Sequence, residues 1–145
     1  MPEVHPSQPP FWILLVEDNP GDVRLVREAF YEAGLLYNLT VLNDGEKAVR
    51  LVERLDEEQR TCPDLVLLDI GLPKKGGFEV LKAMRASRQC GQVPVVMLTS
   101  SDAKKDRDMA AALGVTRYIR KPDRLQDFLQ LGTVFREILT HPQGN

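Results

Sequence analysis

Short apolar runs that each end in a polar side chain are the feature that most constrains the fold of this chain. They lie at 13–16, 65–68, 95–98 and 118–119. Amphipathic segments with apolar residues at helical spacing separate these runs. This alternation predicts an α/β protein in which a mostly parallel sheet carries helices on both faces.

Five strands and five helices fit the chain. A second strand is expected at 39–42 and a final helix over 123–139. Capping residues and glycines predict the other helix starts: near Asn19 or Asp22, at Asp44, after Gly76 and Gly77, and at Asp102. Residues 1–10 contain four prolines and are expected, like residues 140–145, to form a tail outside a single domain at 11–139.

Composition and charge exclude several classes of protein. The 145 residues, 43% of them hydrophobic, suit one domain with one core. The net charge of −2, without a basic stripe, argues against direct nucleic-acid binding. The apolar runs are too short to cross a bilayer, and no signal segment opens the chain. Since Cys62 and Cys90 have neither metal-ligand spacing nor a disulfide-framework pattern, we expect a cytoplasmic protein without a membrane partner.

Polar side chains follow the expected strands. Glu17 and Asp18 follow the first, Asp69 the third, Thr99 the fourth and Lys121 the fifth. Because ligands bind beyond the carboxyl ends of parallel strands, these side chains should meet at one site. Close carboxylates need a cation between them, and Mg²⁺ takes oxygen ligands and binds phosphoryl groups. Asp69 is the candidate nucleophile for a phosphoryl group, whose charge Thr99 and Lys121 would stabilise.

Four motifs in these positions carry a resemblance to a known family. They are Leu15–Pro20 (LVEDNP), Leu68–Pro73 (LDIGLP), Leu98–Ser100 (LTS) and Tyr118–Pro122 (YIRKP). Together they resemble the receiver domain of two-component response regulators, over roughly residues 11–139. The resemblance implies a flavodoxin-like, doubly wound (βα)5 sheet with strand order 2-1-3-4-5. The interval from Asp18 to Asp69 is longer than in compact members, and we place the extra residues at 56–62.

The resemblance also implies a ligand set. Asp18, Asp69 and the Gly71 backbone carbonyl would bind Mg²⁺, with Glu17 acting mainly through a metal-bound water. The Lys121–Pro122 bond would be cis, because only Xaa–Pro bonds adopt that form at low cost. The chain would catalyse its own phosphorylation and dephosphorylation and no other reaction.

A switch and an interface are implied as well. On phosphorylation Thr99 would move toward the phosphoryl group and the Tyr118 ring would turn inward, repacking the surface of the fourth helix, fifth strand and fifth helix. Strand alternation puts Arg120 on the same face as Tyr118, where it is a candidate to pair across an interface. Three residues widen the apolar arc of the last helix: Leu131, Val134 and Ile138. They suggest a homodimer, unless they only pack beneath loops.

The phosphoryl donor must be another protein, because His5 and His141 lie in the expected tails. A sensor histidine kinase or a histidine phosphotransfer protein fits this role. The segment after Lys121 is too short for an output domain, so we expect a stand-alone regulator similar to those that partner phytochrome-type histidine kinases. A phosphorelay intermediate or a phosphate sink is the alternative.

Two other classes fit less well. An aspartate-nucleophile phosphatase needs a second acid two residues after the nucleophile, where this chain has Gly71. In a flavodoxin-like nucleotide binder, Glu17 and Asp18 would repel the phosphate.

Overall fold

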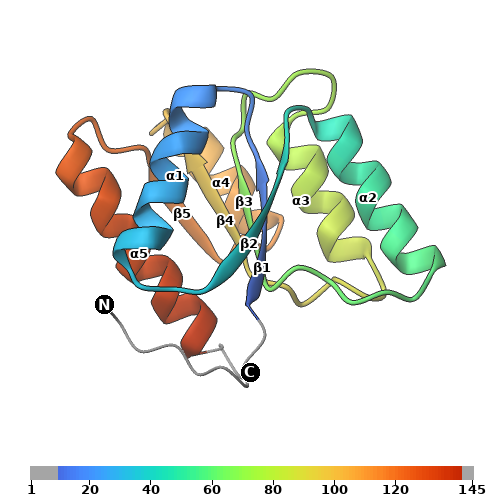
Figure 1. The fold of residues 1–145 in the computed structure, drawn as a ribbon. Coiled ribbons are helices and arrows are strands. Elements are labelled where there is room, and N and C mark those ends of the chain that lie inside the picture. Colours follow the sequence, from blue (N-terminus) through green and yellow to red (C-terminus); the bar gives the residue numbers. More distant parts are fainter. Residues whose placement is uncertain (1–9, 142–145) are drawn as a thin grey trace.

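A five-stranded parallel sheet forms the centre of the molecule (Figure 1). The computed structural model describes residues 10–141. Its strands are β1 (Phe11–Val16), β2 (Tyr37–Leu42), β3 (Leu65–Leu68), β4 (Val95–Thr99) and β5 (Arg117–Arg120). They lie in the order β2-β1-β3-β4-β5, and every neighbouring pair is parallel. The predicted strand order and flavodoxin-like α/β fold are confirmed.

Five helices cover the two faces of the sheet. They are α1 (Pro20–Glu32), α2 (Gly45–Glu57), α3 (Gly77–Ala86), α4 (Lys104–Ala112) and α5 (Leu125–Thr140). α1 and α5 pack on one face, and α2, α3 and α4 pack on the other (Figure 1). We call the segments that follow the strands the carboxyl edge: 17–19, 43–44, 69–76, 100–103 and 121–124. The segments that precede β2 to β5 form the amino edge: 33–36, 58–64, 87–94 and 113–116.

Alternation along the strands explains why both faces need helices. Leu14 and Val16 pack among residues of α2 and α3, whereas Ile13 and Leu15 pack among residues of α1 and α5. All four side chains are at most 1% exposed. A strand buried on both faces has a continuous apolar sequence, so charged residues first occur past its end. The core therefore fixes the strand ends, and the carboxyl edge carries the polar groups.

Side-chain caps confirm two of the predicted helix starts. Asn19 Oδ1 accepts hydrogen bonds from the backbone N–H groups of Gly21 at 2.9 Å and Asp22 at 3.2 Å. Asp44 Oδ1 accepts one from the backbone N–H of Lys47 at 2.8 Å. These bonds satisfy N–H groups that have no partner inside the first helical turn. α1 and α2 therefore begin at fixed places on the carboxyl edge.

The predicted start of the fourth helix is wrong. α4 begins at Lys104, and Ala103 occupies the N-cap position without a side-chain hydrogen bond. Asp102 instead accepts a hydrogen bond from Arg107 Nε at 2.7 Å. The Asp102 carboxylate is thus engaged by an α4 side chain and not by the backbone N–H groups at the start of that helix.

The wide apolar arc of α5 packs inside the chain. Leu131 and Ile138 are 8% and 7% exposed and belong to the core cluster between α1, α5 and the sheet. Val134 is partly buried against the same cluster. This packing leaves little of Leu131 and Ile138 to contact a second copy, so it does not support their predicted place in an interface. Homodimerisation itself stays a prediction.

Cys62 and Cys90 form a disulfide, which the sequence analysis did not predict. Their Cα atoms lie 5.6 Å apart although 28 positions separate them in the sequence. The spacing carried no signal, because the fold brings the segment before β3 beside the turn after α3. Disulfides are rare in the reducing cytosol, and the cytoplasmic location stays a prediction. None of the described helices combines the length and hydropathy needed to cross a membrane.

The predicted tails lie mostly beyond the residues that the structure describes. Of the N-terminal segment 1–10, Pro10 alone is described, and His5 lies outside. At the other end α5 continues to Thr140, one residue past the predicted domain boundary, and His141 follows as its C-cap.

Candidate functional site

The carboxyl edge brings together the side chains that the sequence placed there. Glu17 follows β1, Asp69 follows β3, Thr99 ends β4 and Lys121 follows β5. Strand pairing continues past these ends, because the Asp69 N–H donates to the Val16 carbonyl at 3.3 Å and the Lys121 N–H donates to the Thr99 carbonyl at 2.7 Å. The backbone of the sheet therefore positions the site directly.

Lys121 is the centre of the charge network. Its Nζ lies 2.9 Å from Glu17 Oε1, 2.7 Å from Asp22 Oδ2 and 2.9 Å from Asp69 Oδ2. The lysine side chain is only 10% exposed. An ammonium group has three N–H donors, and the three carboxylates match that number. One cation is therefore shared by acids that follow β1 and β3 and by an acid of α1.

Burial and hydrogen bonding act against each other on these groups. Burial alone would lower the pKa of Lys121, but hydrogen bonds to Asp22, Glu17 and Asp69 outweigh it and raise that pKa. Burial raises the pKa of Glu17, and its contact with Lys121 offsets this only in part. Burial would also raise the pKa of Asp69, but hydrogen bonds from Lys121 and Thr99 outweigh it and lower that pKa. Asp69 is therefore held as a carboxylate, the form that acts as a nucleophile.

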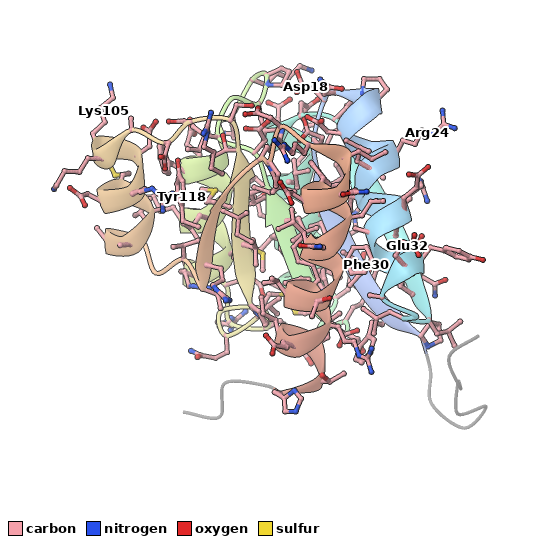
Figure 2. All side chains as sticks on the ribbon, turned by 90° about the vertical axis from the view of Figure 1, so that its left-hand side faces the viewer. Asp18, Arg24, Phe30, Glu32, Lys105 and Tyr118 are labelled. Atoms are coloured by element: carbon pink, nitrogen blue, oxygen red, sulfur yellow. A yellow bond between two sulfur atoms is a disulfide. The ribbon has the colours of Figure 1, made fainter. Side chains whose placement is uncertain are left out.

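Three carboxylates lie close enough to share one metal ion. One oxygen from each of Glu17, Asp18 and Asp69 lies within 4.8 Å of the others. Asp18 projects at the exposed end of the sheet (Figure 2), whereas Glu17 is buried and Asp69 is half-buried. Carboxylate oxygens are the ligands of hard cations such as Mg²⁺. With Asp22 the site holds four carboxylates, and Lys121 contacts three of them, so a further cation fits the charge of the site.

Both carboxylate oxygens of Asp69 are held by donors. Thr99 Oγ1 donates to Asp69 Oδ1 at 2.8 Å, and the Gly71 N–H donates to the same atom at 3.3 Å. Oδ2 accepts from Lys121. A Cβ added at Gly71 would meet no atom within 4 Å. A side chain at this position would point into open space, so packing does not require a glycine here.

Tyr118 links β5 to the segment that follows Thr99. Its hydroxyl donates a hydrogen bond to the Ser101 carbonyl at 2.8 Å. The Arg107 guanidinium, from α4, lies 4.6 Å from the centre of the tyrosine ring, within the range of a cation–π contact. The half-buried ring thus lies on the α4 side of the sheet (Figure 2). Arg120 is exposed at the end of the same strand.

Sequence reasoning missed the part that Asp22 takes in the site. The residue was considered only as a possible helix start, but its carboxylate makes the shortest of the three contacts with Lys121. A signal was present in the sequence: Asp22 lies in the first turn of a helix that begins directly after Glu17 and Asp18. The first turn of such a helix lies at the same edge of the sheet as the acidic pair.

The predicted cis bond before Pro122 is wrong. Every peptide bond in residues 10–141 is trans. The trans form of an Xaa–Pro bond is favoured by about 0.5–1 kcal/mol.

Comparison with known proteins identifies the family. The family model described as the response regulator receiver domain matches residues 13–131. The chain belongs to this family, whose members are the phosphoacceptors of two-component signalling. Response regulator Rcp1 of Synechocystis sp. is 37% identical over 126 residues, which cover 86% of each chain. The probable methanogenesis regulatory protein FilR2 of Methanothrix harundinacea is 36% identical over 125 residues, covering 86% of this chain and 81% of that protein.

Solved structures of the family agree with this assignment. The phosphorylated cyanobacterial phytochrome response regulator RcpA matches with a TM-score of 0.80 and 32% identity, over 91% of this chain and 95% of that one. The Mn²⁺-bound form of Rcp1 matches with a TM-score of 0.79 and 34% identity, over 94% and 98%. The receiver domain of the Pseudomonas aeruginosa sensor kinase PA1611, with magnesium coordinated in its active-site cleft, matches with a TM-score of 0.68 and 28% identity, over 87% and 97%.

Proposed function

We propose that this chain is a response regulator that accepts a phosphoryl group on Asp69 from a phosphohistidine of a partner kinase or phosphotransfer protein. The observation that carries the proposal is the state of the Asp69 carboxylate. It is half-buried, its pKa is lowered by hydrogen bonds that outweigh burial, and two further acids stand within reach of a shared cation. An ionised carboxylate with fixed oxygens is prepared for attack on phosphorus.

The transfer balances as a single displacement. An Asp69 oxygen forms a bond to phosphorus while the bond between phosphorus and the histidine nitrogen breaks. The leaving nitrogen keeps the electron pair and takes a proton, so the partner regains a neutral imidazole. Lys121 Nζ and Thr99 Oγ1, both already at hydrogen-bond distance from Asp69, donate to the phosphoryl oxygens.

Glu17, Asp18 and Asp69 are the proposed Mg²⁺ ligands, together with the Gly71 carbonyl. The three clustered carboxylates support this, as do the manganese in Rcp1 and the magnesium in the PA1611 receiver. A bound Mg²⁺ supplies positive charge that offsets the phosphoryl oxygens and the neighbouring carboxylates. Glu17 is suited to hold this site from the core side, because it is 3% exposed and contacts Lys121.

The proposed output passes through Thr99 and Tyr118. Thr99 Oγ1 donates a hydrogen bond to the Asp69 carboxylate, and this bond must be rearranged when the phosphoryl group is added to that carboxylate. The Tyr118 hydroxyl is bound to the next segment at Ser101, and Arg107 of α4 covers its ring. A shift of the segment after Thr99 would release both contacts and change the α4, β5 and α5 surface. The exposed Arg120 lies on this surface.

The proposed partner is a phytochrome-type histidine kinase. The similarity to RcpA, which is a phytochrome response regulator, supports this class over other sensor kinases. A homodimer through the α4, β5 and α5 surface is proposed with Arg120 and Val134 as its candidate contacts, since Leu131 and Ile138 are largely enclosed.

Phosphorylation by acetyl phosphate tests the proposal without knowledge of the kinase. Wild-type protein incubated with acetyl phosphate and Mg²⁺ should gain the mass of one phosphoryl group, which hydroxylamine removes. Asp69→Asn should gain none. The matched control is Asp102→Asn, an exposed aspartate of the same edge that pairs with Arg107, and it should be modified like wild type. Equal modification of Asp69→Asn and wild type would contradict the proposal.

A further inference from the structure

We propose that Asp22 is a positioning residue for Lys121. Its carboxylate holds the Lys121 ammonium, so that Glu17 and Asp69 are free to bind a cation. This inference deepens the proposed function and rests on the metal site described above. It concerns a carboxylate that lies outside the group of three acids able to share a metal ion.

The contacts of Asp22 single it out from the other acids of the edge. Its Oδ2 lies 2.7 Å from Lys121 Nζ, across 99 positions of sequence. Its backbone N–H donates to the Asn19 side chain, so the helix cap fixes the place from which its carboxylate reaches Lys121. The backbone of Asp22 is thus fixed by the α1 cap, and its side chain contacts Lys121, the first residue after β5.

The three carboxylates that contact Lys121 differ in whether they also belong to the candidate metal site. Glu17 and Asp69 belong both to the lysine network and to the candidate metal site. Asp22 belongs to the lysine network alone. When a cation draws the oxygens of Glu17 and Asp69, Asp22 is the partner that the ammonium keeps.

Without Asp22, two arrangements of the Lys121 ammonium would remain, and both are unfavourable for metal binding. It could stay bound to Glu17 and Asp69 and compete with the cation, or it could lose its partners while only 10% exposed. An unpaired charge at such a position is strongly unfavourable. Asp22 therefore lowers the cost of freeing the metal ligands, and it keeps Nζ near Asp69, where a phosphoryl group would arrive.

The first measurement is the Mg²⁺ affinity of the Asp22→Asn variant by isothermal titration calorimetry. Asparagine keeps the size and one acceptor oxygen but removes the charge. We expect the affinity to fall about tenfold, the low end for a residue that orients a metal site without binding the metal. Asp22→Glu, which restores the charge, should recover most of the loss.

A double-mutant cycle distinguishes an effect of Asp22 on Mg²⁺ affinity through Lys121 from a direct electrostatic effect of its negative charge on the cation. The Asp22→Asn change is repeated in a Lys121→Met background. If Asp22 acts through Lys121, the tenfold effect disappears there, because no ammonium competes for Glu17 and Asp69. If the same fold-change persists in that background, the carboxylate acts on the cation through space and the inference is overturned.

The matched control is Glu46→Gln. Glu46 lies in the first turn of α2 at the same edge and pairs with Arg50 rather than Lys121. Its removal should leave Mg²⁺ affinity within about twofold of wild type, since exposed pairs contribute little. An unchanged affinity in Asp22→Asn would overturn the inference alone. Absence of Mg²⁺ binding by the wild-type chain would overturn the proposed function with it.

Discussion

The two edges of the sheet differ in the interactions that hold them together. At the carboxyl edge and the adjoining first turn of α1, three carboxylates share the ammonium of Lys121, and the carboxylate of Asp18 lies close to two of them. The charges of this site are therefore shared and incompletely balanced. The amino edge carries a covalent bond between Cys62 and Cys90 and hydrogen bonds that join the segments before the strands to one another and to the end of α2. In the proposed function the first edge responds to an added cation or phosphoryl group. The contacts of the other edge join the segments before the strands.

Arg85 is the main polar contact of the amino edge. From the last turn of α3 its Nε donates to the Gly114 carbonyl at 2.8 Å. One terminal nitrogen donates to the carbonyls of Gly91 at 3.2 Å and Val93 at 2.7 Å, and the other donates to Thr116 Oγ1 at 3.3 Å. The segments before β4 and before β5 are thereby joined through one side chain. Burial lowers the pKa of Arg85, yet a guanidinium stays charged in proteins.

A second network surrounds the disulfide. Asp56 accepts hydrogen bonds from Ser87 Oγ at 2.6 Å and from the Gln89 N–H at 2.9 Å. Ser87 Oγ in turn accepts from the Cys90 N–H at 2.9 Å. These bonds join the end of α2 to the turn after α3. We therefore expect substitutions at the amino edge to lower the free energy of unfolding, and substitutions at the carboxyl edge to change Mg²⁺ affinity.

The largest stability effect is expected from Arg85→Met. The change removes the donor of the Gly91, Val93 and Gly114 carbonyls. It also removes one of the two donors of Thr116 Oγ1, which keeps the Val95 N–H at 2.9 Å. Each unsatisfied carbonyl costs about 1 kcal/mol or more. We expect the free energy of unfolding to fall by about 4 kcal/mol in urea titrations. Mg²⁺ affinity, measured on the folded variant, should stay within about twofold, because Arg85 does not touch the carboxyl edge.

The control for this prediction is Arg136→Met. Arg136 makes one long hydrogen bond, to the Ala33 carbonyl at 3.3 Å, from an exposed position on α5. Its loss should cost about 0.5 kcal/mol. If Arg85→Met changed Mg²⁺ affinity as strongly as Asp22→Asn, the proposed independence of the two edges would be refuted.

Reduction of the Cys62–Cys90 bond should have the next largest effect. A cross-link that closes a loop of 28 positions restricts the unfolded chain and stabilises the folded one by about 3 kcal/mol. Treatment with a thiol-free reductant should lower the unfolding free energy by that amount and leave phosphorylation by acetyl phosphate unchanged. The Cys62→Ala, Cys90→Ala double variant should respond to the reductant in neither assay. If the reductant changed phosphorylation of the wild-type protein but not of the double variant, the disulfide at the amino edge would be coupled to the phosphorylation site.

The difference between the edges also decides what sequence reasoning could find. Glu17, Asp69, Thr99 and Lys121 were predictable as neighbours, because each directly follows or ends a strand and parallel strands end at one edge. The contact between Asp22 and Lys121 depends on how α1 is rotated against the sheet, which periodicity does not specify. Arg85 and the cysteine pair join segments that precede strands, where no apolar run or motif marks the position.

The smallest predicted effects concern pH, and they distinguish two acids within the carboxyl edge. In metal-free protein the raised pKa of Glu17 means that its charged form weakens the fold as pH rises above 4.5, its ordinary value. The lowered pKa of Asp69 means that its contribution to stability is lost as pH falls below 3.8. Relative to wild type, Glu17→Gln should therefore gain stability from pH 4.5 to 7, and Asp69→Asn should lose stability as pH rises from 2 to 4. Urea titrations in a chelator would measure both slopes, and equal slopes would show that Lys121 does not discriminate between the two acids.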